Sequence, residues 1–436
     1  MTGTPRYAIC GLSNRGISLF VMPLLGVGES DLSAHGELVA IVDVDRERVE
    51  QFNAQPTHAS VPYYSPDEFD RMVTETEPDT ILVTSPDYTH ADYVVRALKH
   101  GIDVITEKPM AASCAQVQAI RRAEHESTAS VRVTHNMRYQ PRNRQIKRML
   151  LDGLVGRVTS VDYLWSLDTY HGASYFYRWN RQRDYSGGLS IHKACHHFDL
   201  INWWLDDIPE QVFAYGARNY YGWDSPHNPS RRDGVDYTVA EQKQRCPYFR
   251  RWLSDGSLPA DDHLTPRTGS QGLPYGVQYP PDHPIYLYDD QIDIEDTYSA
   301  VVRYRRGASM SYAVTFSGAW EGFRVGINGT HGRIETADYS FRQHAEAPPD
   351  SRTITYYPMF GERQVHDVAA AAGTHRGADP LIRHDLLVGP APESQELAIA
   401  ADSRQGAYAV AIGEGVWRSV RDNRPYTIAE LLPAES

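Results

Sequence analysis

The chain of 436 residues is longer than one hydrophobic core usually supports, so two domains are expected, with three as the alternative. Hydrophobic residues make up 41% and charged residues 23%, a balance that excludes a largely disordered chain. The net charge of −13 argues against nonspecific binding to nucleic acid or to an anionic membrane, because both require clustered Lys and Arg side chains.

The sequence contains neither a membrane-segment pattern nor a targeting pattern. No window approaches the roughly 18 consecutive apolar residues of a bilayer-spanning helix. The N-terminus lacks the charged and apolar regions of a signal peptide and enters a strand pattern almost at once. We therefore expect a cytoplasmic protein. Its widely separated cysteines are expected to be reduced thiols: Cys10, Cys114, Cys195 and Cys246.

The first 135 residues alternate short apolar runs with amphipathic stretches. The apolar runs predict strands at 7–11, 38–43, 80–84, 104–106 and 131–134. The amphipathic stretches predict helices at 14–25, 45–54, 66–76, 88–100 and 113–125. Strands that alternate with helices indicate right-handed βαβ units, and continuously apolar strands indicate a sheet covered on both faces. Residues 1–135 are therefore predicted to form a doubly wound parallel sheet of the Rossmann type.

After residue 136 the pattern changes to that of an antiparallel sheet. A helix is predicted at 140–152, and period-two alternation predicts strands at 158–167, 300–305, 309–316 and 323–328. Turns are expected at Arg306-Gly307 and Asn328-Gly329. Residues 222–284 carry nine of the 27 prolines and predict an irregular insertion, and 396–422 predict a closing helix. The expected fold class is therefore α/β, with an α+β second domain at 136–436 that holds a largely antiparallel open sheet.

The first predicted strand ends in a glycine-rich turn, Gly11-Leu12-Ser13-Asn14-Arg15-Gly16. Gly11 permits a tight turn and Gly16 lets the helix pack closely, so that free N–H groups face a pyrophosphate. Ser13 stands where the usual motif has its second glycine. Asp43 ends the second strand, where a carboxylate accepts from ribose hydroxyls and repels a 2′-phosphate, so NAD is favoured over NADP. A Rossmann-like domain that binds another ligand, or none, is the alternative.

The strand at 104–106 leads into Glu107-Lys108-Pro109. Ligands of an open parallel sheet lie outside the carboxyl ends of its strands, so Lys108 is expected near the nicotinamide ring. Glu107 can stabilise the charge of the lysine. A solvated lysine at the end of a strand is the alternative interpretation.

A second polar cluster follows Gly187-Gly188 in the second domain. On one helix, His192, His196 and Asp199 would share a face, because they are four and three residues apart. Such a face can bind a metal or can hold one histidine as a general base. The metal interpretation lacks the glutamate of H-E-x-x-H and a distant ligand, so we predict no metal site.

These motifs together resemble the Gfo/Idh/MocA oxidoreductases, the group of glucose-fructose oxidoreductase and inositol dehydrogenase. The likeness extends to Ser85-Pro86…His90, Asn136-Met137-Arg138-Tyr139, Glu295-Asp296-Thr297 and the hairpin at 328–335, and it covers nearly the whole chain. It implies an NAD(P)-dependent enzyme that moves a hydride to or from a carbinol carbon of a sugar, glycoside or cyclitol. It also implies pairing of subunits through the open sheet, hence a homodimer or homotetramer.

The resemblance also implies roles for individual residues. Lys108 would bond the reacting oxygen and His196 would be the acid/base, but many relatives have Asp where His192 stands, so either histidine or a coupled pair can take the proton. Expected cofactor contacts are Gly11, Ser13, Asn14, Arg15, Gly16, Asp43, Ser85, Pro86, His90, Glu107, Lys108 and Asn136. Expected substrate contacts are Lys108, Arg138, His192, Lys193, His196, Asp199 and, from a late polar loop, His375 with Asp379.

Three functions are compatible with these residues. A sugar or cyclitol dehydrogenase or ketoreductase is favoured. A glycosidase that oxidises a ring carbon, eliminates the aglycone and then reduces the product would use His192 and Lys193 as its additional acid and base. A non-catalytic NAD-dependent sugar sensor is the third, and the presence of both Lys108 and His196 argues against it.

Overall fold

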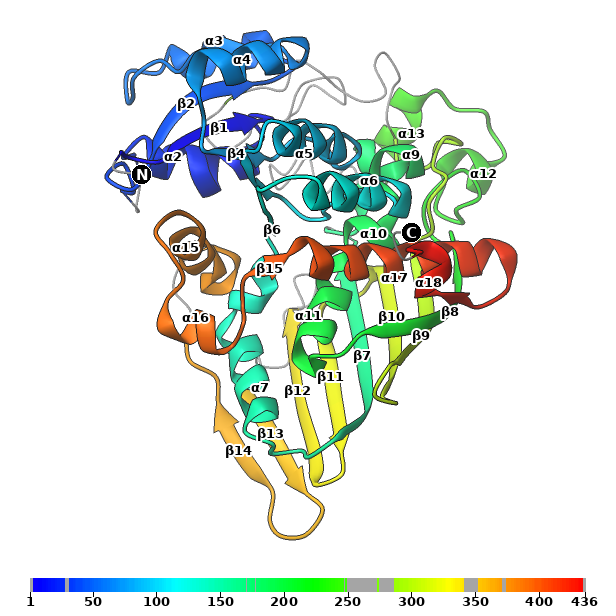
Figure 1. Cartoon of the computed structure of the whole chain (residues 1–436). Coiled ribbons are helices and arrows are strands. Elements are labelled where there is room, and N and C mark those ends of the chain that lie inside the picture. Colours follow the sequence, from blue (N-terminus) through cyan, green and yellow to red (C-terminus); the bar gives the residue numbers. More distant parts are fainter. Residues whose placement is uncertain are drawn as a thin grey trace. The chain divides into compact units, whose positions relative to one another are not determined.

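The computed structural model describes residues 3–27, 31–169, 171–176, 178–246, 248, 273, 286–340, 352–370 and 374–433. The chain divides into two compact units (Figure 1). The first unit comprises Met1–Gln140, Thr265–Pro281 and Ala372–Ala407. The second unit comprises Pro141–Leu264, Asp282–Ala371 and Tyr408–Ser436.

The first unit contains a seven-stranded sheet in the order β15-β6-β5-β4-β1-β2-β3. Its strands are β1 (Arg6–Cys10), β2 (Glu37–Val42), β3 (Tyr63–Tyr64), β4 (Thr80–Val83), β5 (Asp103–Thr106), β6 (Val131–Val133) and β15 (Ala401–Asp402). Every pair is parallel except β15 with β6. The predicted doubly wound parallel sheet is confirmed. The edge strands β3 and β15 were not predicted, since two residues carry no periodicity.

The predicted helices of this unit are present, and each ends within a few residues of its expected bounds. The first is divided into α1 (Asn14–Gly16), a π-helical turn η1 (Ile17–Val21) and α2 (Met22–Leu24). The others are α3 (Arg46–Asn53), α4 (Phe69–Thr76) after η2 (Pro66–Glu68), α5 (His90–Lys99) after η3 (Asp87–Thr89), and α6 (Cys114–His125). Local chemistry fixes their starts: the Ser113 side chain accepts from the N–H of Gln116 at the start of α6.

A late part of the chain also belongs to the first unit. It includes α15 (Thr374–Leu387), α16 (Pro392–Glu396) and β15, and α15 packs against η4 (Asn136–Tyr139). The domain division expected from the sequence assigned all residues after 135 to the second domain. The structure differs because β15 extends the parallel sheet beside β6, and because Arg138 donates from Nη1 to the carbonyl oxygen of Ile399 at 3.1 Å.

The second unit contains a nine-stranded sheet in the order β14-β13-β12-β11-β7-β10-β9-β8-β16. Its strands are β7 (Val158–Asp168), β8 (Pro209–Ala217), β9 (Thr297–Tyr304), β10 (Ser309–Gly318), β11 (Glu321–Gly329), β12 (Gly332–Ser340), β13 (Thr353–Pro358), β14 (Gln364–Asp367) and β16 (Tyr426–Thr427). Among the described strand pairs of this sheet, β7–β10 alone is parallel, which confirms the largely antiparallel sheet. The turn expected at Asn328-Gly329 is wrong: both residues lie in β11, and Asn328 pairs with Arg333.

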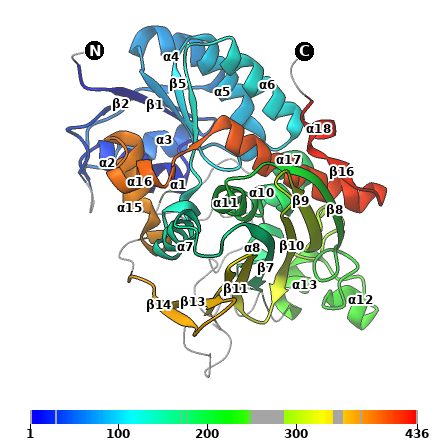
Figure 2. The same ribbon diagram turned by 60° about the horizontal axis from the view of Figure 1, so that its bottom comes forward.

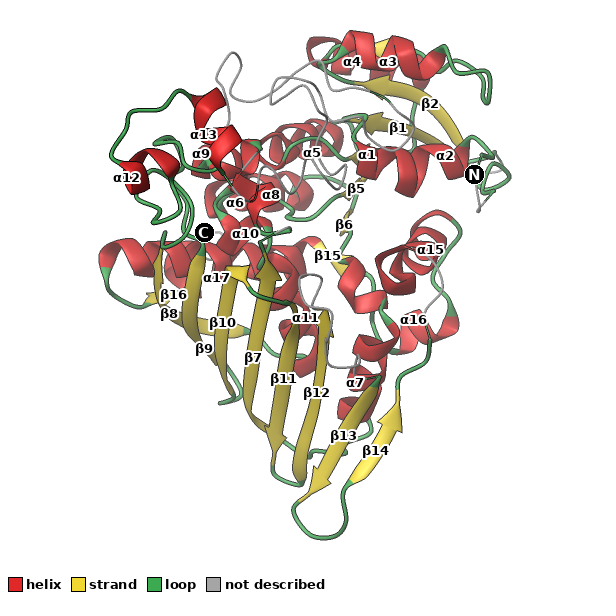
Figure 3. Cartoon of the chain, turned by 180° about the vertical axis from the view of Figure 1, so that it is seen from behind, coloured by secondary structure: helices red, strands yellow, loops and turns green. Residues whose placement is uncertain are grey.

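Helices cover one face of this sheet, and no described helix lies on the other face (Figures 1 and 3). The covering helices include α7 (Pro141–Leu151), α11 (Cys195–Leu205) and α17 (Ser403–Asp422). Figure 2 shows α7 beside α11, and the indole N–H of Trp204 donates to the carbonyl oxygen of Asn143 at 3.0 Å. The burial pattern of β9 explains this arrangement, because every second side chain faces the helices.

Two further expectations need correction or lie partly outside the described residues. The closing helix begins at Ser403 rather than 396, because 396–402 contain the end of α16 and β15. In the predicted insertion, α12 (Pro229–Asp233) and α13 (Val239–Arg245) are described, whereas 249–272 and 274–285 lie outside the described residues. No described helix is both long enough and apolar enough to cross a bilayer. None of the four cysteines forms a disulfide.

Candidate functional site

The glycine-rich turn of the first unit requires its glycines. Gly11 has φ +92°, and a Cβ there would lie 2.5 Å from the Cα of Ser85. At Gly16 a Cβ would lie 2.4 Å from Oγ1 of Thr84. Ser13, at the place of the missing glycine, caps α1 by accepting from the N–H of Gly16 at 3.0 Å. The turn thus packs directly against the end of β4, where the backbone can approach a dinucleotide closely.

Two charged side chains hold this turn from the side of β2. Asp43 accepts through Oδ2 from the N–H of Leu12 at 2.5 Å and through Oδ1 from the N–H of Asp45 at 2.8 Å. Burial raises the pKa of Asp43, and these N–H bonds oppose that rise. The buried Arg48 donates from Nε to the carbonyl oxygen of Leu12 at 2.8 Å and from Nη2 to Oδ1 of Asn14 at 2.9 Å. Sequence reasoning missed Arg48, because an arginine in the first turn of a helix usually faces solvent.

The segment after β5 places Lys108 at the carboxyl end of the parallel sheet. Glu107 is buried; its Oε1 accepts from Nε of Arg15 at 3.0 Å, and its Oε2 accepts from the backbone N–H of Lys108 at 3.2 Å. The Lys108–Pro109 peptide bond is cis. His90 lies between two loops, with Nδ1 2.8 Å from the carbonyl oxygen of Pro109 and Nε2 2.8 Å from that of Ser85. His90 therefore holds together the loop after β4 and the loop after β5, beside which NAD is expected to bind.

A buried carboxylate, Asp87, lies near this lysine. Burial raises the pKa of Asp87 to about 7, although the positive charges of His90 and Lys108 act in the opposite direction. Asp87 opens η3, one residue after the predicted cofactor contact Pro86. Sequence reasoning did not single it out.

The buried Asp87 predicts a pH dependence of stability that Asp87→Asn removes. An unfolded aspartate titrates near 3.9, so between about pH 4 and 7 the folded state binds more protons than the unfolded state. The free energy of unfolding therefore falls as pH rises through this window, by about 4 kcal/mol in total, because each pKa unit of difference corresponds to about 1.36 kcal/mol. Urea unfolding at pH 4.5 and 7.5 measures this fall. Equal falls in the wild type and the Asn variant would contradict the assignment.

The late polar loop reaches the glycine-rich turn within the first unit. Arg15 donates from Nη1 to Oδ2 of Asp379 at 2.8 Å, and Nδ1 of His375 lies 2.6 Å from the same oxygen. Burial acts to raise the pKa of Asp379, but the hydrogen bonds from His375 and Arg15 outweigh burial and hold it below the ordinary value. His375, expected to contact substrate, thus lies beside the turn expected to bind the cofactor.

Two expected contacts near residue 136 are buried. Asn136 begins η4. The guanidinium of Arg138 donates to the carbonyl oxygen of Ile399 at 3.1 Å and to Oε1 of Gln405 at 3.2 Å. These bonds favour a structural role for Arg138, which ties η4 to the late segment of the same unit.

In the second unit, the histidine motif is divided between two short helices. His192 ends α10 (Leu189–His192), and α11 begins at Cys195. The single helix face expected for the two histidines and Asp199 is therefore wrong, because the chain makes a turn at Lys193-Ala194. His196 and Asp199 share α11 and are buried, whereas His192 and Lys193 are half-buried.

Aromatic rings surround His192. The rings of Tyr175 and Trp179 meet it edge-on, with centroids 5.5 and 5.4 Å away. Nδ2 of Asn180 lies 3.0 Å from Nε2 of His192. Nζ of Lys193 lies 5.6 Å from the ring centroid of Trp165. Charged and hydrogen-bonding groups among aromatic faces suit a ring that carries many hydroxyls.

A Tyr–His–Glu arrangement adjoins this cluster. Nδ1 of His171 lies 2.9 Å from Oε1 of Glu321, and its Nε2 lies 3.1 Å from the hydroxyl of Tyr175. Burial lowers the pKa of His171, which favours the neutral ring, with Nδ1–H donating to the carboxylate and Nε2 accepting from the phenol. Sequence reasoning missed this arrangement, because Glu321 is 150 residues from His171.

Within the described part of the chain, no group of three or more His, Cys, Asp or Glu side chains gathers in an arrangement that could hold a metal ion. His171 lies beside a carboxylate and a phenol, and His192 lies beside an amide.

Comparisons with protein families match both parts of the chain. Residues 6–135 match the model "Oxidoreductase family, NAD-binding Rossmann fold", and residues 147–428 match "Oxidoreductase family, C-terminal alpha/beta domain". The chain belongs to the Gfo/Idh/MocA oxidoreductase family. The resemblance recognised in the sequence is thereby confirmed, and so is NAD as the cofactor of the first unit.

Individual Gfo/Idh/MocA proteins show how far the likeness extends. The putative oxidoreductase YteT of Bacillus subtilis is 44% identical over 431 residues, which cover 98% of each chain. The inositol 2-dehydrogenase of Rubrobacter xylanophilus is 28% identical over 185 residues, 41% of this chain and 48% of that enzyme. An Agrobacterium radiobacter oxidoreductase solved with NAD⁺, L-tartaric acid and magnesium has a TM-score of 0.63 at 14% identity, covering 99% and 100% of the two chains.

Proposed function

We propose that this protein is an NAD-dependent dehydrogenase or ketoreductase that acts on a carbinol carbon of a sugar, glycoside or cyclitol. The observation that carries the proposal is Lys108. It follows β5 of an NAD-binding Rossmann unit, and its backbone N–H is bonded to Glu107, which in turn is held by Arg15 of the glycine-rich turn. The ammonium of a lysine whose backbone is held in this way suits stabilisation of an oxyanion.

The residues of the first unit fit a dinucleotide. The glycine cradle at Gly11 and Gly16 would hold the pyrophosphate, and Asp43 would hold the adenosine ribose. When bound, NAD supplies the hydride acceptor of the oxidation. In the proposed reaction, Lys108 bonds the substrate hydroxyl and stabilises the developing alkoxide, and His196 accepts the hydroxyl proton.

The substrate class is proposed from the second unit. Rings of Tyr175 and Trp179 beside His192, together with the amide of Asn180, offer stacking surfaces and hydrogen bonds to a polyhydroxylated ring. Similarity to an inositol 2-dehydrogenase supports the same class.

A second candidate, an NAD-recycling glycosidase, is favoured by the Tyr–His–Glu arrangement. Oxidation of a ring carbon acidifies the neighbouring C–H bond; a base then removes that proton, and the glycosidic oxygen leaves with a proton from an acid. Water adds to the resulting double bond, and return of the hydride completes a net hydrolysis. Tyr175, linked to His171 and Glu321, offers a proton-transfer group beyond His196.

The deciding experiment mixes purified protein and NAD with sugars, glycosides and inositols and follows near-ultraviolet absorbance of NADH. A rise with the wild type that depends on Lys108 supports the dehydrogenase. The same mixtures are assayed for released aglycone, because cleavage without net NADH identifies the glycosidase. Ketosugars with NADH test the reverse reaction. Absence of turnover in all three assays would contradict both proposals.

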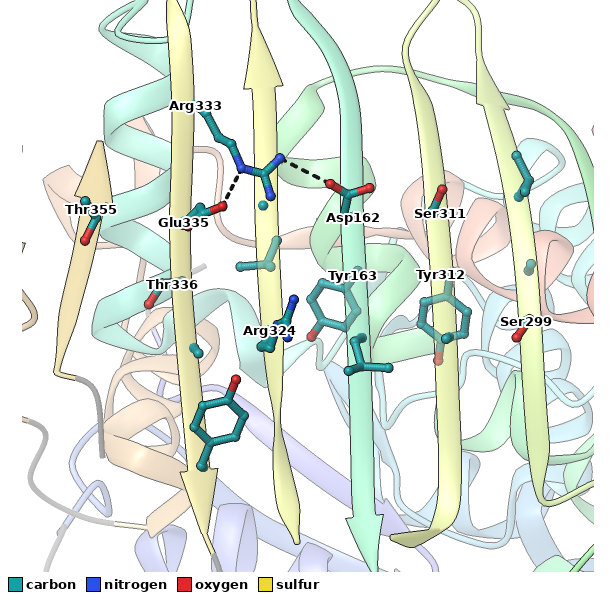
Figure 4. A pocket seen from close by; sticks show the side chains of 18 of the residues that line it. Asp162, Tyr163, Ser299, Ser311, Tyr312, Arg324, Arg333, Glu335, Thr336 and Thr355 are labelled. Atoms are coloured by element: carbon teal, nitrogen blue, oxygen red, sulfur yellow. Dashed lines mark hydrogen bonds and ion pairs between the residues drawn. The ribbon is translucent and has the colours of Figure 1, made fainter. Parts of the chain in front are cut away.

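We also propose that the helix-free face of the second unit's sheet joins copies of this chain. Figure 4 shows that face, which forms a groove of about 930 Å³ crossed by an ion-paired network in which Arg333 bonds Asp162 and Glu335. Apolar side chains on β8 and β9 also line the groove, and Tyr215 is 64% and Val301 53% exposed. Exposed apolar groups on a regular, otherwise solvated face suit an interface.

Val301→Asp is therefore expected to shift the protein to monomers, because it buries an unpaired charge at each copy of the interface. Light scattering coupled to gel filtration measures the mass. Val44→Asp, at an exposed valine of the first unit, is the matched control. An unchanged mass for V301D would contradict the assignment.

A further inference from the structure

A chain of charged side chains runs from the end of β5 to the surface of the first unit. Glu107 and Asp379 are nearly buried and share Arg15, which bonds them at 3.0 and 2.8 Å. His375 follows, 2.6 Å from Asp379, with its side chain 54% exposed. Arg15 belongs to the glycine-rich turn and Glu107 precedes Lys108. These side chains therefore connect the turn expected to bind the pyrophosphate with the segment expected to lie near the nicotinamide.

The backbone at His375 is strained. Three consecutive residues are left-handed: His375, Arg376 and Gly377 have φ values of 51°, 58° and 78°. Of these residues, only the glycine adopts this conformation readily. Such conformations are unfavourable for non-glycine residues and concentrate at binding and catalytic sites. Within this strained turn, Nδ1 of His375 lies 2.6 Å from Oδ2 of Asp379.

The chain of side chains cannot carry a proton to or from Lys108. Arg15 stands in its middle, and a guanidinium does not give up its proton in proteins. Its function must therefore be binding or positioning. Nδ1 of His375 lies 2.6 Å from Oδ2 of Asp379 and 3.3 Å from Nη1 of Arg15. In the tautomer whose Nδ1–H donates to the carboxylate, Nε2 presents a lone pair away from Asp379. Among the described residues, this nitrogen has no partner.

We propose that His375 and Asp379 complete the NAD site of the first unit, with His375 accepting a hydrogen bond from the nicotinamide ribose. A lone pair on Nε2 attracts a hydroxyl and repels a phosphate oxygen, which selects the ribose over the pyrophosphate. The ribose also lies between the pyrophosphate, expected at the turn of Arg15, and the nicotinamide, expected at Lys108. Asp379 is the positioning residue that fixes the ring.

This inference rests on NAD binding and deepens the proposed function, but its test requires no substrate. Calorimetry measures the Kd of NAD, ADP-ribose and ADP for the wild type, His375→Ala and Asp379→Asn. NAD and ADP-ribose contain the second ribose, whereas ADP lacks it. We expect both variants to weaken NAD and ADP-ribose about three- to tenfold and to leave ADP within twofold. The double variant should weaken NAD no more than the stronger single variant, because both residues act through one hydrogen bond.

The matched control is His100→Ala. Nε2 of His100 lies 3.0 Å from Asp70 in another His–Asp pair of the same unit, at the opposite end of α5 from His90. An unchanged Kd of NAD for H375A would overturn the inference, and equal weakening of all three ligands would overturn it in favour of a role in folding the turn. A wild type that binds no NAD would overturn the proposed function as well.

Discussion

Lys108→Met is expected to lower kcat/KM by two to three orders of magnitude while the Kd of NAD stays within a fewfold of the wild type. Methionine keeps the length of the side chain and removes the ammonium, so the alkoxide that forms as the hydroxyl is oxidised loses its cation. Removal of one preorganised donor from an oxyanion typically costs this factor. NAD binding survives because the backbone bond from Lys108 to Glu107 does not involve the ammonium.

The measurement is initial rate against substrate concentration, with the substrate found in the NADH assay. Lys99→Met is the matched control, since Lys99 is an exposed lysine at the end of α5. Lys108→Arg retains the positive charge, so it is expected to keep more activity than Lys108→Met. It should not reach the wild-type rate, because a planar guanidinium differs in shape from an ammonium. Activity of K108M within fivefold of the wild type would contradict the proposed role of Lys108.

The parts of the fold that the sequence predicted are those determined by neighbouring residues. Continuous apolar runs identified β1, β2, β4, β5 and β6, since a strand covered on both faces must be apolar throughout. The amphipathic stretch at 113–125 predicted α6, and in the structure Ser113 caps the start of this helix. The two-residue strands β3 and β15 were not, because each depends on an edge formed by residues distant in sequence.

The candidate site divides in the same way. Gly11, Gly16, Glu107 and Lys108 belong to short motifs whose spacing carries the chemistry, so they could be found without a structure. The partners of these residues could not. Arg15 meets Asp379 across 364 positions of the chain, and no local pattern encodes that pairing. His375 was singled out, but its place beside Arg15 came only from the fold.

The division of the histidine motif bears on which histidine takes the proton. His192 ends α10 and His196 lies in α11, so they need not act as a stacked pair on one helix. The amide nitrogen of Asn180 lies 3.0 Å from Nε2 of His192, where it occupies the lone pair with which that ring would accept a proton. Edge-on rings on two sides restrict His192 further.

His196→Asn is therefore expected to lower kcat by two to four orders of magnitude, and His192→Asn by no more than about tenfold. Loss of the base also removes the fall of kcat at low pH that its protonation causes, so only H196N should flatten that limb of the pH profile. His197→Asn is no suitable control, because His197 lies 2.8 Å from the Tyr312 hydroxyl in the core. The reverse order, with H192N losing both rate and acidic limb, would assign the proton transfer to His192. Equal losses in both variants, with no further loss in the double variant, would indicate a coupled pair.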